Sequence, residues 1–511
     1  MRAFALLAAS SLPVTAWAHG FDERYDLPAP LGFFVAGAAL TVALSFVVAV
    51  RFARSAPAPA SVRAPPATGT SRPGRMIPAL RWICRLVSFL LFAVTLVAAL
   101  WGTADPMMNL APTLVWIVWW VGLSLLVACV GNVWPVLDPW RTLFEGIDAL
   151  ARRAGRPAGI SFGWRWPRAL GVWPAVALLL AWSWLEVVYP VAAVPTRLGC
   201  AMLVWSGLTL IGMVCFGRET WQRNADVFAL YFAMLGRMAP LASDAHGRRI
   251  VVRAPGAGLI ADQAGAPAPP AGASAFVIAM LSTVLFDGLH GGQAWLLHER
   301  LLTGLAPRWM DINGYFAGTV GLVGVWLLFY AAYESTCRAT ARLVTAVPAA
   351  LIARHFAPTL VPIAVAYNVA HNFSSLLIQG QNAIPLLSDP LGWRWDLFGT
   401  AGFRANIGIV DARLTWTVAI FAIVTGHVIA VWLAHRVALR EAGTTRGAAL
   451  ASIPLTALMV AYTAISLAVI AEPMVTFVAP IVAVAPVASP ALPWNRARAP
   501  HWLPADVINP A

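Results

Sequence analysis

Residues 31–50 read LGFFVAGAALTVALSFVVAV, an uninterrupted stretch without a charged side chain. A helix needs about 20 such residues to cross a hydrocarbon core of roughly 30 Å. Similar windows recur along the chain, which has 511 residues and is 60% hydrophobic and only 11% charged, whereas about 25% charged is usual for soluble proteins. We therefore predict an all-α polytopic integral membrane protein. Its ten transmembrane helices are expected near residues 31–50, 83–101, 112–130, 170–189, 198–216, 274–292, 318–337, 356–379, 414–436 and 449–472.

The N-terminus has the pattern of a cleaved signal peptide, residues 1–18. An apolar core at residues 3–12 is too short to span a bilayer, and Ala16-Trp17-Ala18 is a small-residue cleavage site. Cleavage there leaves His19 at the mature N-terminus, where its α-amine and imidazole together can chelate a divalent metal ion. In the alternative interpretation His19 has no ligand, and the acidic segment 19–30 is simply solvated beside the membrane.

Arginine decides the orientation, because all 35 basic residues are arginine and none is lysine. With the mature N-terminus outside, the segments assigned to the cytoplasm hold 25 arginines and the external segments hold 9. The positive-inside rule then places both mature termini in the periplasm. The predicted organisation is a periplasmic segment 19–30, a transmembrane domain 31–472 and a periplasmic tail 473–511, with cytoplasmic loops at 51–82, 131–169 and 217–273.

The net charge of +13 follows from the same arginines, which lie in loops beside anionic lipid. We therefore expect the lipid bilayer, and no nucleic acid, as a partner. Within the loop 217–273, apolar residues at helical spacing predict a helix at 224–238 that lies along the inner membrane surface. The five cysteines are scattered and predict no disulfide. Motifs for nucleotide, haem or zinc-protease chemistry and the serine-hydrolase elbow are all absent.

Ionisable residues within the predicted spans are costly and therefore mark functional sites. Thr283, Asp287 and His290 lie on one helical stripe. A second stripe holds Asn368, Asn372, Ser375 and Gln379, with His371 beside it. Glu186 lies near the outer end of its span, in line with Trp182, and His427 is expected at mid-membrane. Each polar residue has an alternative role as an interhelical hydrogen-bonding group that only holds spans together.

The joint set favours metal-assisted hydrolysis, because imidazole and carboxylate ligands suit Zn²⁺, Mn²⁺ or Co²⁺ and a bound ion activates water. We predict Asp287, His290 and His371 as catalytic residues. The predicted metal ligands are His290, His371, Asp287 and His19. The predicted substrate-binding residues are Glu186, Trp182, Asn368 and Asn372.

Four stretches carry a resemblance to a known family: HGFDERYDLPAPL (19–31), STVLFDGL (282–289), LVPIAVAYNVAHNFSSLLIQGQ (360–381) and LLSDPLGWRWDLFGTA (386–401). They resemble a family of polytopic bacterial membrane proteins, some of which are described as components of a membrane-bound fenitrothion hydrolase. The resemblance implies hydrolysis of organophosphate triesters in the bacterial inner membrane, with a possible second membrane subunit. It carries over no catalytic residue.

Two other functions fit the same residues. A transporter or channel would use the intramembrane Asp, His and Asn side chains as a solute or proton path. A copper-handling membrane protein would use the mature N-terminal His19. The sequence leaves both alternatives open beside the hydrolase.

Overall fold

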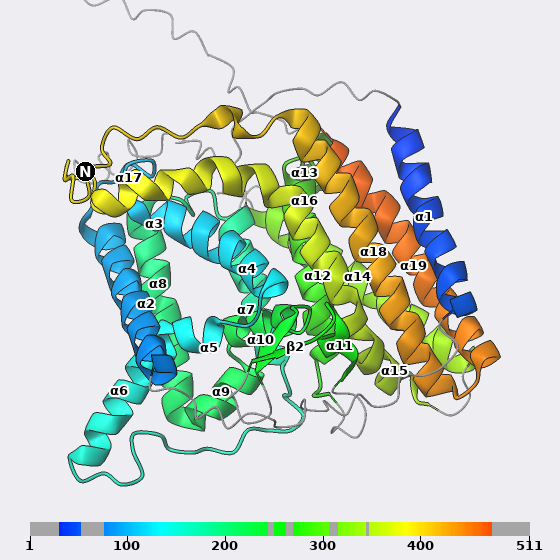
Figure 1. The fold of residues 1–511 in the computed structure, drawn as a ribbon, viewed down its shortest axis with the longest axis horizontal. Helices are drawn as coiled ribbons and strands as arrows, with labels where there is room; N and C mark the ends of the chain where they lie inside the picture. The colour runs from blue at the N-terminus through cyan, green and yellow to red at the C-terminus, as the bar shows by residue number, and fades with distance from the viewer. Residues whose placement is uncertain are drawn as a thin grey trace, which may run out of the picture. The chain divides into compact units, whose positions relative to one another are not determined.

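The computed structural model describes residues 30–52, 76–243, 250–261, 269–305, 315–343 and 347–472, all within one compact unit, 1–474. This unit is built from helices, with a single two-stranded sheet in its described part (Figure 1). The elements are α1 (Leu31–Phe52), α2 (Met76–Trp101), α3 (Leu110–Pro112), η1 (Thr113–Leu123), α4 (Ser124–Cys129), α5 (Trp134–Leu137), α6 (Pro139–Arg153), α7 (Trp173–Ser183), η2 (Trp184–Val188), α8 (Pro195–Phe216), α9 (Arg218–Asn224), α10 (Val227–Gly236), β1 (Leu241–Ser243), β2 (Ile250–Val252), α11 (Ala257–Ala261), α12 (Ala273–His290), α13 (Gln293–Leu305), α14 (Tyr315–Leu343), α15 (Ala349–Phe356), η3 (Ala357–Leu360), α16 (Val361–Gln379), η4 (Gly380–Asn382), α17 (Ala383–Ser388), η5 (Ile407–Ile409), α18 (Ala412–Ala442) and α19 (Thr445–Ala471).

Nine stretches of helix in the described residues are long and apolar enough to cross a membrane. They match nine of the ten predicted windows. The remaining window, 170–189, corresponds to a shorter apolar helix, Trp173–Val188, which α7 and η2 form together. The predicted all-α polytopic membrane fold is therefore confirmed.

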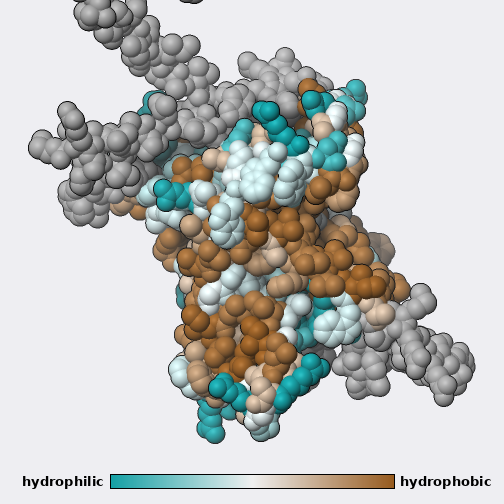
Figure 2. Space-filling model, turned by 90° about the vertical axis from the view of Figure 1, so that its left-hand side faces the viewer, coloured by the Kyte–Doolittle hydropathy of each residue, from teal (hydrophilic) through white to brown (hydrophobic). Residues whose placement is uncertain are grey.

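The outward faces of these helices are apolar. On α2 the exposed side chains include Leu80, Ile83, Leu86 and Leu90. Figure 2 shows one side of the molecule, where hydrophobic residues cover much of the surface between hydrophilic residues at the upper and lower ends. This distribution is expected of a protein whose sides face lipid and whose ends face water.

Helices α16, α18 and α19 form a closely packed group with α1, to the right in Figure 1. Gly426 of α18 shows why small residues are needed here. A Cβ atom at this position would lie 2.4 Å from the Ala366 Cβ and 2.7 Å from the Pro362 carbonyl oxygen of α16. Such close approach of helix backbones is typical of membrane proteins, in which small residues let helices pack tightly.

Helix α10 corrects the prediction for residues 224–238. It is not on the membrane surface but inside the protein, where Phe228, Tyr231 and Phe232 are buried in the main core. The reason is that its ten residues are apolar on every side, which is typical of a buried helix, whereas a surface helix needs a polar face. Its N-terminus is capped by Asp226, whose Oδ1 accepts hydrogen bonds from the backbone N–H groups of Phe228 and Ala229.

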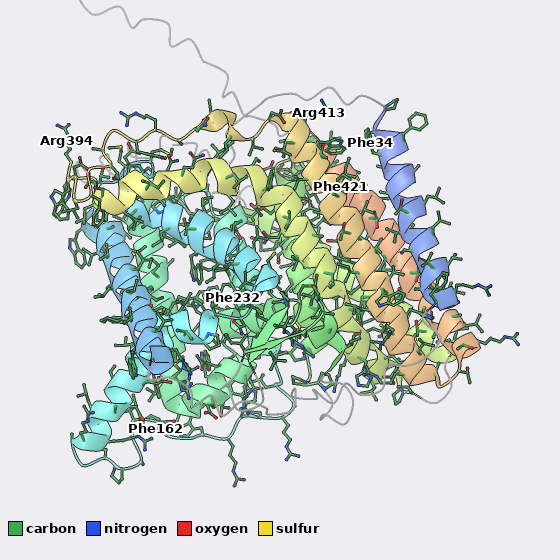
Figure 3. All side chains as sticks on the ribbon, in the orientation of Figure 1. Phe34, Phe162, Phe232, Arg394, Arg413 and Phe421 are labelled. Carbon is green, nitrogen blue, oxygen red and sulfur yellow. The ribbon has the colours of Figure 1, made fainter. Side chains whose placement is uncertain are left out.

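The two ends of the bundle carry different loops. Arg394 of the segment between α17 and α18 and Arg413 at the start of α18 lie at the upper end in Figure 3, and Phe162 of the segment after α6 lies at the lower end. The sequence assigns these two segments to opposite sides of the membrane.

All five cysteines are unpaired.

Candidate functional site

An acidic residue of α12 meets a histidine of α16 inside the helix bundle. The Oδ2 atom of Asp287 lies 2.9 Å from Nε2 of His371. The Asp287 side chain is 22% exposed and that of His371 only 4%. The contact joins two spans at a point where water is scarce, so each polar group compensates for the burial of the other.

A second carboxylate lies beside this pair. Glu186 interacts electrostatically with Asp287, and its Oε2 accepts a 2.9 Å hydrogen bond from the indole Nε1 of Trp120. Both residues lie in π-helical stretches, Glu186 in η2 and Trp120 in η1. Such wide turns are rare and are frequent at functional sites, so their meeting here is consistent with a functional role for the region.

Helix α10 contributes Tyr231 to the same region. Its ring stacks on Trp120, with centroids 4.9 Å apart, and its hydroxyl interacts with the side chains of Ser124 and Asn368. It also interacts with Glu186. Asn368, predicted to bind substrate, is thus buried and directed toward α10, one helical turn before His371.

Tyr367 adds a buried hydroxyl next to the Asp287–His371 pair. Its ring stacks on that of His371, with centroids 6.1 Å apart, and it interacts electrostatically with Asp287. Within the described residues its hydroxyl has no hydrogen-bond partner. The space it occupies exists because residue 288 is glycine, since a Cβ atom there would lie 2.4 Å from the Tyr367 Oη.

His290, predicted as a catalytic residue and metal ligand, takes a different position. It interacts electrostatically with Asp287, but its ring packs between Phe286 and Trp295, at centroid distances of 5.6 and 5.3 Å. In the part of the chain that the structure describes, no group of three or more His, Cys, Asp or Glu side chains is arranged to hold a metal ion. Asp287 and His371 instead contact each other directly, and His19 lies outside the described residues. The divalent ion therefore stays a prediction.

The other predicted residues have different surroundings. Trp182 is buried in an aromatic cluster, where it packs against Trp120 at 5.5 Å and Phe228 at 5.1 Å. Asn372 is half-buried on α16. His427 is buried on α18, with Nδ1 2.8 Å from the Ile423 carbonyl oxygen. Trp182 therefore packs against Trp120, and the Nδ1 atom of His427 contacts a carbonyl oxygen of its own helix.

Sequence reasoning missed Trp120, Tyr231 and Tyr367 as members of the site. Trp120 lies in a uniformly apolar span, so nothing in its neighbourhood distinguishes it from other lipid-facing or core tryptophans. Tyr231 lies in the segment for which the sequence predicts a surface helix. Tyr367 offered the one available signal, because it lies one turn before His371 on the polar stripe.

Comparison with models of protein families, with curated proteins and with solved structures finds no match to this chain. The fold and the site together define a class: an all-α polytopic membrane protein with a partly buried Asp–His pair and a neighbouring carboxylate between its helices.

Proposed function

We propose that this protein is a membrane-bound hydrolase of neutral, lipophilic organophosphate triesters such as fenitrothion. The observation that carries the proposal is the 2.9 Å contact between Asp287 and His371. A carboxylate that contacts a histidine orients the imidazole and stabilises the imidazolium that forms when it accepts a proton, which is the arrangement that general-base catalysis requires. The sequence resemblance supplies the substrate class.

The proposed reaction begins with His371 removing a proton from a water molecule. The resulting hydroxide attacks phosphorus, a new P–O bond forms, and the bond to the aryl oxygen breaks. The electron pair leaves with the nitrophenolate, which is a good leaving group and needs little acid assistance. The proton on His371 then returns to solvent. Tyr367 supplies an O–H group close to the pair, and a hydrogen-bond donor of this kind stabilises negative charge that develops on a phosphoryl oxygen.

The test measures nitrophenol release from a phosphotriester by purified protein in detergent. His371→Gln is expected to lower turnover at least about tenfold, as is typical for loss of a functional group or of its supporting partner. The matched control is His435→Gln, which removes another buried histidine whose Nδ1 lies 3.2 Å from the Ser452 hydroxyl. Equal activity of the wild type and His371→Gln, with both proteins folded, would contradict the proposal.

The same assay tests the predicted metal ion. Chelation followed by addition of Zn²⁺, Mn²⁺ or Co²⁺ should remove and restore activity if an ion takes part. Loss of activity on adding one residue before His19 would indicate that the α-amine of His19 helps to bind the metal ion. If the same addition also abolishes copper uptake, the copper-handling alternative is favoured.

A proton-coupled transporter is a second candidate. It is favoured by the placement of Glu186, Asp287 and His371, three titratable groups from three helical segments that meet within the bundle. Such chains of carboxylates and histidines form proton paths in transporters. Accumulation of an unchanged organophosphate in proteoliposomes, driven by a proton gradient, would support transport, whereas release of nitrophenol supports hydrolysis.

The proposal includes the bacterial inner membrane as the location, with a cleaved signal peptide and a periplasmic N-terminus. The arginine distribution supports this orientation. Reporter fusions after Arg63 and Arg253 should indicate the cytoplasm, and one after Asp389 the periplasm. A periplasmic signal from the Arg63 fusion would reverse the orientation. Co-purification with a second membrane protein would test the heteromer that the resemblance implies.

A further inference from the structure

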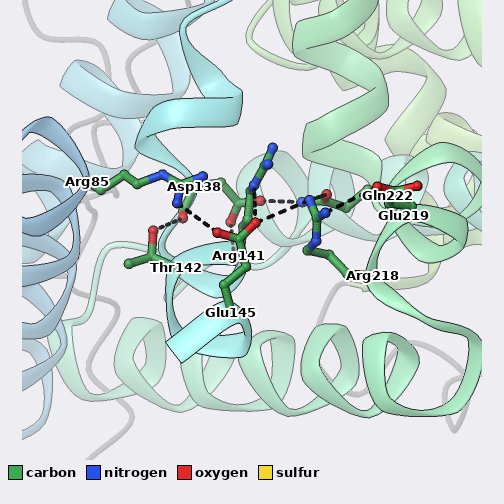
Figure 4. Close-up of polar contacts among 8 residues, drawn as sticks. All are labelled: Arg85, Asp138, Arg141, Thr142, Glu145, Arg218, Glu219 and Gln222. Atoms are coloured by element: carbon green, nitrogen blue, oxygen red, sulfur yellow. Dashed lines mark hydrogen bonds and ion pairs between the residues drawn. The ribbon is translucent and has the colours of Figure 1, made fainter. Parts of the chain in front are cut away.

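A cluster of arginines lies far from the proposed catalytic residues in sequence, where α2, α6 and α9 approach one another (Figure 4). Three guanidinium groups converge on one carboxylate, that of Glu145. Its oxygens lie 2.7 Å from Nη1 of Arg85, 2.9 Å from Nε of Arg141 and 3.5 Å from Nη1 of Arg218. We refer to Arg85, Arg141 and Arg218 as the arginine cluster.

The arginine cluster has more hydrogen-bond donors than its neighbours accept. Besides Glu145, the acidic group in contact is Glu219, which is exposed and lies 3.4 Å from Nη2 of Arg218. Asp138 interacts electrostatically with Arg141, but its Oδ2 accepts a 2.7 Å hydrogen bond from Gln222 and its Oδ1 accepts from the backbone N–H of Arg141 and caps α6. Three guanidinium groups have many more N–H donors than these carboxylates accept, so the cluster can take a further anion.

The cluster also lies beside an apolar surface. Arg85 is buried on α2, and its guanidinium carbon lies 5.4 Å from the ring centroid of Trp82, which is 64% exposed. Leu86, the next residue on the helix, is exposed as well. An exposed tryptophan near the end of a spanning helix is typical of the interfacial region where lipid headgroups lie. Arg141 and Arg218, at 21% and 20% side-chain exposure, provide access to the cluster.

We propose that the arginine cluster binds the phosphate of an anionic phospholipid, whose acyl chains lie along the exposed apolar face of α2. Basic pockets between membrane helices recognise lipid phosphates in this way, and Arg is suited to them because its planar group donates two parallel hydrogen bonds. Free phosphate can accept the same hydrogen bonds from the arginines, but it has no apolar part that would contact Trp82 and Leu86. The adjoining apolar surface therefore favours the lipid.

The experiment uses native mass spectrometry of the full chain titrated with phosphatidylglycerol, and with phosphatidylcholine as the neutral lipid. Arg141→Gln and Arg218→Gln should each lower the affinity for phosphatidylglycerol about fivefold, the equivalent of the roughly 1 kcal/mol that one arginine contributes at an anionic surface. Binding of phosphatidylcholine should not change. Thermal unfolding in phosphatidylcholine alone verifies that each variant is folded.

The matched control is Arg152→Gln. Arg152 lies on the same helix, α6, and forms a similar 2.8 Å ion pair with Asp148 four residues earlier, but it is outside the cluster. It should bind phosphatidylglycerol as the wild type does. Glu145→Gln should raise the affinity, because it removes the carboxylate that competes with the lipid. An equal loss in Arg152→Gln and Arg141→Gln, or complete displacement of the lipid by inorganic phosphate, would overturn the assignment.

Discussion

The Asp287–His371 pair and the arginine cluster use charge in opposite ways. The pair places one acidic and one basic group between two spanning helices, close to a second carboxylate and to the Tyr367 hydroxyl, which has no hydrogen-bond partner among the described residues. The cluster places three arginines around Glu145, with Arg141 and Arg218 in the first turns of α6 and α9. A few ionisable side chains within membrane spans are costly in free energy and are found mostly at functional sites. Several arginines near the membrane surface cost less and attract anionic lipid headgroups.

The difference predicts how each region responds to the loss of one group. In the buried pair the remaining partner loses its compensation, so function should fall steeply. In the cluster the other arginines remain, so the effect should be graded and limited to lipid binding.

The largest expected effect is that of Asp287→Asn. It keeps the shape of the side chain but removes the charge that orients His371, so phosphotriester turnover should fall about 10–100-fold. Glu145→Gln makes the same chemical change in the arginine cluster and should leave turnover within about twofold. Initial rates of nitrophenol release measure both. Similar losses in the two variants would remove the distinction between the regions.

Gly288→Ala sharpens the comparison inside the bundle. The added methyl group would lie 2.4 Å from the Tyr367 Oη and 3.2 Å from Cγ1 of Val469. Overpacking of this kind costs about 1–3 kcal/mol, more than the gain of about 1 kcal/mol in helix propensity. Thermal unfolding should shift to lower temperature. The control is Gly324→Ala on α14, which meets nothing within 4 Å and should be neutral or slightly stabilising.

The next prediction concerns pH and the caps near the arginine cluster, outside the nine candidate spans. Burial, with a smaller contribution from Asp138, raises the pKa of Asp226 from 3.8 to about 7, and burial raises the pKa of Asp138 to about 6. The folded protein therefore binds protons that the unfolded chain has lost. For these groups the free energy of unfolding falls as the pH rises from about 4 to about 7.

Asp226→Asn keeps the oxygen that accepts from Phe228 and Ala229 and removes the titrating group. It should flatten the pH dependence of the unfolding temperature between about pH 5 and about pH 7.5. Asp148→Asn is the control, because the hydrogen bond from Arg152 lowers the pKa of Asp148, which is ionised throughout this range. Parallel curves for the wild type and Asp226→Asn would contradict the prediction.

The smallest effect is expected for Arg152→Gln. Its ion pair with Asp148 is exposed on the Arg152 side, and exposed pairs of this kind contribute about 0.3–0.5 kcal/mol. The shift in unfolding temperature should be close to the error of measurement. A large destabilisation would mean that isolated surface charges in this protein matter as much as the buried pair.

The sequence predicted the helices that cross the membrane because their length and apolar character are set by the bilayer itself. It failed for α10, because the helical spacing of its apolar residues predicted one apolar face, whereas the helix is apolar on every side. Burial became evident only once α4, α7 and α16 were placed around it. The hydrophobicity of the window 170–189 also does not show that the helix formed by α7 and η2 is shorter than the other nine.

For the site, Asp287 and His371 could be identified because each is an ionisable residue in an apolar stretch. Their direct contact depends on how α12 packs against α16, which the sequence does not specify. His290 satisfied the same sequence criterion, yet its ring packs against Phe286 and Trp295. The role of Trp120 depends on the π-helical geometry of η1, which no pattern of residues in the sequence predicts.

The π-helical stretches η1 and η2 have a consequence for how this site responds to insertions and deletions. A π-helical turn holds about one residue more than an α-helical turn, so removing one residue from such a stretch and restoring regular turns changes the direction of the side chains within it. The bond between Trp120 and Glu186 therefore depends on the number of residues in η1 and η2 as well as on their identity. Relatives that differ by a single-residue gap in either stretch should have lost this hydrogen bond even where both residues are retained.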